Sequence, residues 1–124
     1  MPSSASILIV DDNRDAADLL GEALRTFGYA IHVAHTGLEA LALVESVHPA
    51  AALLDIGLPE MTGYELARAL RRRVPGIKLV AVTGYGQPAD RERALTIGFA
   101  EHLVKPALID DVVATLDRLL GNAP

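Results

Sequence analysis

Short runs of aliphatic residues recur along the chain and predict β-strands. The runs that start at residues 7, 51 and 77 are continuously apolar rather than alternating, which is typical of strands covered on both faces in a parallel sheet. Five such runs are present, at residues 7–10, 30–34, 51–54, 77–82 and 102–104. Each is followed by a stretch long enough to be a helix, so the pattern predicts alternating strands and helices.

The stretches that follow the strands have the spacing and the boundaries of helices. Apolar residues recur three and four positions apart over three of them, at 16–27, 66–74 and 108–120. Two Thr and Glu pairs have the spacing of a capping box, which satisfies the free amides of a first helical turn. The pairs are Thr36 with Glu39 and Thr62 with Glu65. The stretch 89–97 is more polar and less amphipathic, and we expect a further helix there.

Alternating strands and helices predict a three-layer α/β domain. Parallel neighbours are joined by right-handed crossovers, which place helices on both faces of one sheet. With 124 residues the chain has room for one domain of this kind, and we expect it to span residues 1–124 with its core at about 6–120. Ligands of such sheets bind beyond the carboxyl ends of the strands.

The composition narrows the classes of function. The chain has 16 Asp and Glu against 11 Lys and Arg, and this net charge of −5 argues against non-specific binding to nucleic acid or to anionic membranes. It has no cysteine, which excludes a disulfide scaffold, a thiolate metal site and a cysteine nucleophile. No secretory segment and no apolar stretch of about 20 residues is present, so we expect a cytoplasmic protein without membrane or nucleic-acid partners.

Polar residues follow four of the five predicted strands, at the edge where ligands are expected. The first strand is followed by Asp11 and Asp12, the third by Asp55, the fourth by Thr83 and the fifth by Lys105. Three carboxylates this close together repel one another unless a cation compensates. Mg²⁺ prefers oxygen ligands and is usually held by one or two carboxylates together with phosphate oxygens. The set therefore indicates phosphoryl transfer.

Within this set, Asp55 is the best candidate for a nucleophile. An aspartate carboxylate can attack phosphorus and form an acyl phosphate. Asp55 directly follows an apolar run and precedes a turn-rich loop, which we expect to leave it exposed at the rim of the sheet. Mg²⁺ and the ammonium group of Lys105 would neutralise the phosphoryl oxygens, and the hydroxyl of Thr83 would donate one hydrogen bond.

Four segments resemble the receiver domain of two-component response regulators over about residues 6–120. They are ILIVDDN, LLDIGLPEMTGYE, AVTGY and HLVKP, in this order and spacing. The resemblance implies a flavodoxin-like, CheY-like fold, a doubly wound five-stranded parallel sheet with strand order 2-1-3-4-5. It also implies that a histidine kinase or a phosphotransfer protein donates the phosphoryl group. The domain would then change the face formed by its fourth helix, fifth strand and fifth helix, where a downstream protein binds.

The resemblance also implies a role for each residue of the acidic cluster. Asp55 corresponds to the phosphoacceptor and is one of the ligands of Mg²⁺ or Mn²⁺. Asp12 corresponds to a direct metal ligand, and Asp11 to a residue that binds the metal mainly through water. The backbone carbonyl of Gly57 corresponds to the third protein ligand.

Further residues correspond to the part of the family that senses phosphorylation. Thr83 and Lys105 match the hydroxyl and the lysine that bind the phosphoryl group, and Pro106 matches the proline after a cis peptide bond. Three residues before the lysine the family usually carries Tyr or Phe, and this chain departs from it with His102, a candidate switch residue. Gly84 gives the loop after the fourth strand conformational freedom.

Other interpretations remain open at this point. Asp11 and Asp12 could simply cap the following helix, where carboxylates favour the positive end of the dipole. A phosphatase of the haloacid dehalogenase type also uses an Asp nucleophile and Mg²⁺, but it normally needs a second Asp where this chain has Gly57. A degenerate receiver would bind partners without phosphorylation, and the complete set of five strand-end residues argues against it.

The expected activity is confined to the receiver itself. The resemblance implies self-phosphorylation from a donor and slow autodephosphorylation, with no enzymatic output domain. We expect no DNA-binding or kinase module after the last predicted helix. We therefore expect a stand-alone regulator, a phosphorelay shuttle or the receiver of a hybrid histidine kinase, which is a monomer or a weak phosphorylation-dependent dimer.

Overall fold

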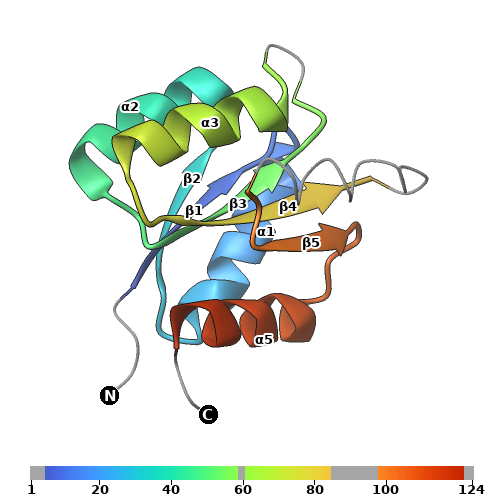
Figure 1. Ribbon diagram of the computed structural model, residues 1–124. Helices are drawn as coiled ribbons and strands as arrows, with labels where there is room; N and C mark the ends of the chain where they lie inside the picture. The colour runs from blue at the N-terminus through green and yellow to red at the C-terminus, as the bar shows by residue number, and fades with distance from the viewer. Residues whose placement is uncertain (1–4, 59–60, 85–97, 122–124) are drawn as a thin grey trace.

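Five parallel strands form one sheet at the centre of the computed structural model, which describes residues 5–58, 61–84 and 98–121 (Figure 1). The strands are β1 (Ser6–Val10), β2 (Ala30–Ala34), β3 (Ala51–Asp55), β4 (Lys78–Thr83) and β5 (Glu101–Val104). Their order across the sheet is β2-β1-β3-β4-β5, and every neighbouring pair is parallel. The predicted sheet and strand order are confirmed, and each predicted strand boundary lies within one residue of the observed one.

Helices cover both faces of this sheet. One face carries α1 (Arg14–Arg25) and α5 (Ile109–Leu120), and the other carries α2 (Gly37–Val47) and α3 (Gly63–Arg73) (Figure 1). The helix predicted at 89–97 lies outside the described residues. α1 ends before Phe27, whose side chain is about half exposed, so the apolar spacing extended this helix too far.

The two faces of the sheet have separate hydrophobic cores, because successive residues of a strand point to opposite faces. Leu8 and Ala81 belong to the core beneath α2 and α3, whereas Ile7 and Leu53 belong to the core beneath α1 and α5. Both sets are almost completely buried. This double coverage explains why the strand sequences are continuously apolar rather than alternating.

The helix starts are only partly as predicted. The capping box at α3 is complete, since the Thr62 hydroxyl accepts a bond from the Glu65 amide and the Glu65 carboxylate accepts one from the Thr62 amide. At α2 only the Thr36 hydroxyl accepts a bond, from the amide of Glu39. The side chain of Asn13 caps α1 by accepting a hydrogen bond from the amide of Ala16. The prediction that Asp11 or Asp12 could simply cap this helix is therefore not needed to explain them.

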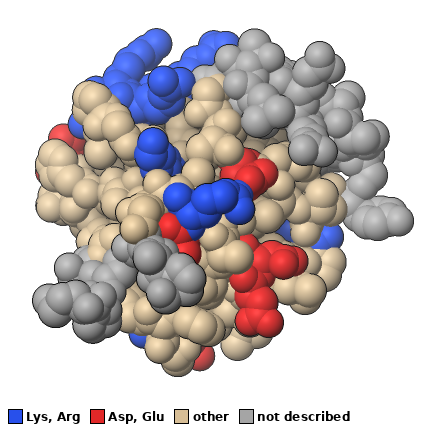
Figure 2. Space-filling view, turned by 60° about the horizontal axis from the view of Figure 1, so that its bottom comes forward, with Lys and Arg blue, Asp and Glu red and all other residues tan. Residues whose placement is uncertain are grey.

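The surface of the described part of the chain is mixed in charge. On the face shown in Figure 2, basic and acidic side chains lie among uncharged ones. None of the helices in the described ranges combines the length and the apolar character that a membrane span requires.

Candidate functional site

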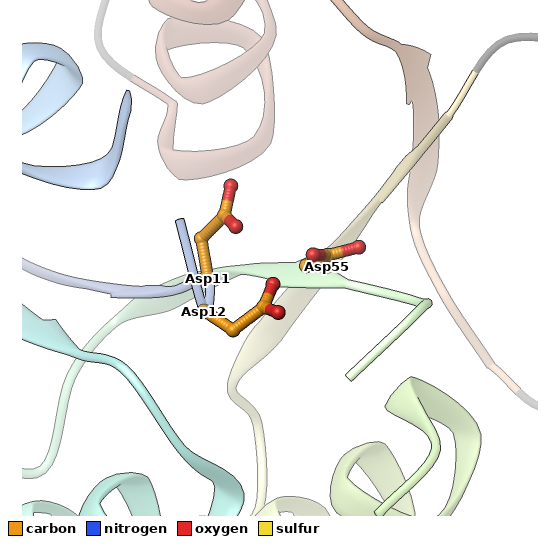
Figure 3. Close-up of side chains that lie close together, drawn as sticks. All are labelled: Asp11, Asp12 and Asp55. Atoms are coloured by element: carbon orange, nitrogen blue, oxygen red, sulfur yellow. The ribbon is translucent and has the colours of Figure 1, made fainter. Parts of the chain in front are cut away.

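Three carboxylates meet at the carboxyl edge of the sheet, where β1 and β3 end side by side (Figure 3). One carboxylate oxygen each from Asp11, Asp12 and Asp55 lies within 4.8 Å of the others. Asp11 and Asp55 are buried, and Asp12 is exposed. Oxygen atoms of several carboxylates at this spacing are suited to a hard divalent cation such as Mg²⁺ or Mn²⁺.

Lys105 brings a positive charge into this acidic cluster. Its Nζ lies 3.0 Å from Oδ2 of Asp11 and 3.3 Å from Oδ2 of Asp55. Burial by itself would lower the pKa of Lys105, but the hydrogen bonds and charges of Asp11 and then of Asp55 raise this pKa above its ordinary value. Lys105 is therefore a cation at neutral pH that offsets part of the carboxylate repulsion.

The surroundings of Asp55 differ from the sequence expectation. Asp55 is only 8% exposed, so the prediction that it lies exposed at the rim is wrong. The sheet continues past the strand end, because the Ile56 amide donates to the carbonyl of Val82 at 3.1 Å. The Gly57 amide then donates to Oδ1 of Asp55 at 2.9 Å. The turn thus folds over the carboxylate and orients it instead of leaving it open.

A cavity of about 540 Å³ opens beside the cluster, between α1 and the segment after β5. Asp11 and Lys105 line its polar side, and Leu19, Leu20 and Pro106 line its apolar side. The side chain of Leu19 is 70% exposed. The cavity therefore borders the polar cluster and has a predominantly apolar lining.

Thr83 and His102 form a second polar contact at the same edge of the sheet. Thr83 is buried and His102 is half-buried. Oγ1 of Thr83 lies 3.0 Å from Nε2 of His102. Sequence analysis singled out both residues but did not foresee that they bond to each other, because the contact depends on the register of β4 and β5.

The remaining predicted site residues lie around these two groups. The peptide bond between Lys105 and Pro106 is cis. Gly57 is exposed next to Asp55, and Gly84 is partly exposed after β4. Sequence reasoning missed Asn13, whose amide donates to Oδ1 of Asp11 at 2.9 Å and so orients that carboxylate. The sequence did contain a sign of this residue's structural role, since an Asn just before an apolar helical repeat is typical of a helix cap.

Fold and site together define a class, a doubly wound α/β domain with an acidic site at the carboxyl edge of its sheet. The family model described as the response regulator receiver domain matches residues 7–117. The chain therefore belongs to this family, whose members act in two-component phosphorelay signalling. Receiver domains generally bind Mg²⁺ at an acidic Asp cluster, and the donor set of Asp11, Asp12 and Asp55 fits such an ion.

Comparison with individual proteins gives the same family. The chain is 32% identical to response regulator MprA of Mycobacterium bovis over 117 residues, which cover 94% of this chain and 51% of that protein. Response regulator MprA of Mycobacterium avium is 32% identical over 114 residues, which cover 92% and 50% of the two chains. This chain thus spans about half the length of these curated relatives.

Solved structures of receiver domains have the same fold. A CheY-like receiver domain from Methanospirillum hungatei superposes with a TM-score of 0.89 at 34% identity, covering 96% of this chain and 95% of that one. Chemotaxis protein CheY4 of Vibrio cholerae superposes with a TM-score of 0.87 at 27% identity, covering 94% and 99%. The CheY-like assignment of the fold is confirmed by these similarities.

Proposed function

We propose that this chain accepts a phosphoryl group on Asp55 from a phosphohistidine of a histidine kinase or a histidine phosphotransfer protein in the cytoplasm. The observation that carries the proposal is the position of Lys105, whose Nζ lies between Asp11 and Asp55 at 3.0 and 3.3 Å. A cation held against two carboxylates of a three-carboxylate cluster is suited to receive the oxygens of an incoming phosphoryl group.

In the proposed transfer, a carboxylate oxygen of Asp55 attacks the phosphorus atom of the donor. A P–O bond forms, the P–N bond of the phosphohistidine breaks, and its electron pair stays on the donor imidazole. Lys105 binds a phosphoryl oxygen, and the Thr83 hydroxyl donates a hydrogen bond to another. Asp12, Asp55 and the Gly57 carbonyl, with Asp11 mainly through water, would hold Mg²⁺ or Mn²⁺, which would supply the remaining positive charge.

The low exposure of Asp55 bears on how a donor reaches it. With 8% of its surface exposed, Asp55 has little direct access from solvent. The cavity between α1 and the segment after β5 is open next to Asp11 and Lys105. We infer that the donor approaches from this side and covers the exposed Leu19 while its phosphohistidine enters the polar end.

Phosphorylation is proposed to act on a downstream protein rather than on a substrate. The face concerned is formed by β5, α5 and the helix predicted at 89–97, which lies outside the described residues. Apart from phosphoryl acceptance and slow autodephosphorylation, we propose no catalysed reaction for this chain. We expect it to be a monomer or a weak phosphorylation-dependent dimer.

The proposal is tested by incubating the chain with acetyl phosphate and Mg²⁺ and measuring its intact mass. We expect the wild-type chain to gain one phosphoryl group, and Asp55→Asn to gain none. Asp110→Asn is the matched control, because Asp110 lies in the first turn of α5 and not in the cluster, and it should gain the group as wild type does.

Two outcomes would contradict the proposal and point to the alternatives. A wild-type chain that neither gains mass nor binds Mg²⁺ would indicate a receiver that binds partners without phosphorylation. Sustained hydrolysis of p-nitrophenyl phosphate that depends on Asp55 would indicate a phosphatase instead.

A further inference from the structure

The hydroxyl of Thr83 already has a partner in the unphosphorylated chain. Its Oγ1 lies 3.0 Å from Nε2 of His102, within hydrogen-bond distance. Thr83 is only 1% exposed, and His102 is half-buried. Because a buried hydroxyl that loses its partner is costly, this hydrogen bond holds the Thr83 side chain until another partner replaces His102.

The register of the sheet places this contact away from the acidic cluster. Ala81 pairs with His102 and Thr83 pairs with Val104, so Thr83 and His102 are diagonal neighbours on one face. That face is the one beneath α2 and α3, because Ala81 belongs to its core. Asp55 has the opposite alternation, since Leu53 of the same strand belongs to the core beneath α1 and α5.

The Thr83 hydroxyl therefore has two competing hydrogen-bond partners, His102 and a phosphoryl group on Asp55. A threonine hydroxyl carries one proton and can donate it to one acceptor at a time. A phosphoryl group on Asp55 presents acceptor oxygens and needs this proton, as the proposed function requires. With Nε2 unprotonated, His102 accepts this same hydroxyl proton. With Nε2 protonated, His102 instead donates to Oγ1 and still fixes the side-chain rotamer of Thr83.

We propose that His102 is a positioning residue that retains the Thr83 hydroxyl and so opposes the phosphorylated conformation. The inference rests on the proposed phosphorylation of Asp55. Its consequence is that the phosphorylated conformation forms at the expense of the bond between His102 and Thr83. Removing the ring nitrogens should then favour the phosphorylated conformation rather than weaken it.

The test compares the binding of beryllofluoride, used as the phosphoryl probe with Mg²⁺, to wild type and to variants at position 102. His102→Phe keeps a ring of similar size but has no nitrogen, and we expect it to bind beryllofluoride about threefold to tenfold more tightly, as losing one competing hydrogen bond implies. His102→Gln keeps an amide that can bond to Thr83 and should bind as wild type does.

His32→Phe is the matched control. His32 is a half-buried histidine on β2, at the opposite edge of the sheet from β5. The substitution makes the same chemical change far from Thr83, so beryllofluoride affinity should not change. A gain in affinity in this control equal to that of His102→Phe would overturn the inference.

A second measurement needs no change at position 102. In wild type, beryllofluoride should shift the NMR resonance of the His102 Nε2 nitrogen, because the bond to Thr83 breaks. In Thr83→Val this resonance should already differ from wild type, and beryllofluoride should move it little. A wild-type resonance that does not respond to beryllofluoride would overturn the inference.

The outcomes separate this inference from the proposed function. If wild type gains a phosphoryl group from acetyl phosphate but His102→Phe binds beryllofluoride no more tightly, the positioning role is wrong and the phosphoacceptor role stands. If wild type neither gains mass nor binds beryllofluoride, the phosphoacceptor role is wrong. The proposed role of His102, which depends on it, is then wrong as well.

Discussion

Replacing Asp55 with asparagine should stabilise the chain when no divalent metal is present. The substitution removes one of three clustered negative charges and nearly preserves the shape of the side chain. The amide oxygen of the substituted side chain can still accept the hydrogen bond that the Gly57 amide donates to Oδ1 of Asp55 at 2.9 Å. The amide nitrogen cannot accept the bond that Lys105 donates to Oδ2 of Asp55 at 3.3 Å, so this bond is lost together with the charge. The change is otherwise electrostatic.

The distances in the cluster set the size of this effect. Carboxylate oxygens within 4.8 Å repel by about 3.5 kcal/mol per pair at an effective dielectric constant of about 20. Lys105, at 3.3 Å, attracts Asp55 by about 5 kcal/mol on the same scale. Removing the charge of Asp55 ends two repulsions, by Asp11 and by Asp12, which together amount to about 7 kcal/mol. It also ends the attraction to Lys105 of about 5 kcal/mol, so the net stabilisation is about 2 kcal/mol.

Urea unfolding in the presence of a chelator measures this difference. A gain of about 2 kcal/mol should raise the midpoint by roughly 1 M, since the slope for a small domain is about 1–3 kcal/mol per M. Glu22→Gln removes an exposed charge from the middle of α1 and should leave the midpoint nearly unchanged.

Adding Mg²⁺ should reduce the difference between Asp55→Asn and wild type. A metal present at about a hundred times its dissociation constant stabilises the folded chain by about 2.7 kcal/mol. Wild type offers one more carboxylate ligand than the variant and should gain more from the metal. If metal-free Asp55→Asn is no more stable than wild type, Lys105 already neutralises the cluster and the reasoning is refuted.

Three further substitutions test other parts of the structure. Lys105→Ala should still take up a phosphoryl group from acetyl phosphate but show no phosphorylation-induced NMR shifts, and unchanged shifts would contradict a switch role. Without metal it should lose about 3–5 kcal/mol in urea unfolding, because it leaves the buried carboxylates of Asp11 and Asp55 without their cation. Because the pKa of Lys105 is raised, this loss should be constant at neutral pH and decrease only above the ordinary lysine pKa of 10.5. Gly63→Ala should cost about 1–3 kcal/mol, because an added Cβ would lie 2.7 Å from the backbone Cα of Ile56. Gly84→Ala meets no neighbour among the described residues and should be nearly neutral.

The fold and the membership of the acidic site could be predicted because both depend on local pattern. Continuous apolar runs predicted strands covered on both faces, and the two cores on either side of the sheet account for that pattern. Asp11, Asp12 and Asp55 were singled out because they lie at the carboxyl ends of predicted strands, and parallel strands end at the same edge. The strand order itself came from the family resemblance, since periodicity does not specify which strands are neighbours.

The contacts within the site were decided only by tertiary structure. Lys105 reaches Asp11 and Asp55, and His102 reaches Thr83, across strands that are far apart in the sequence. Asp55 is buried, and a hydrogen bond from the Ile56 amide to the Val82 carbonyl extends the sheet beyond it. Residue types and spacing determine which chemical groups arrive at the edge of the sheet. Strand register and the path of the following turn determine which of them bond, because hydrogen bonds and ion pairs require atoms within a few ångströms.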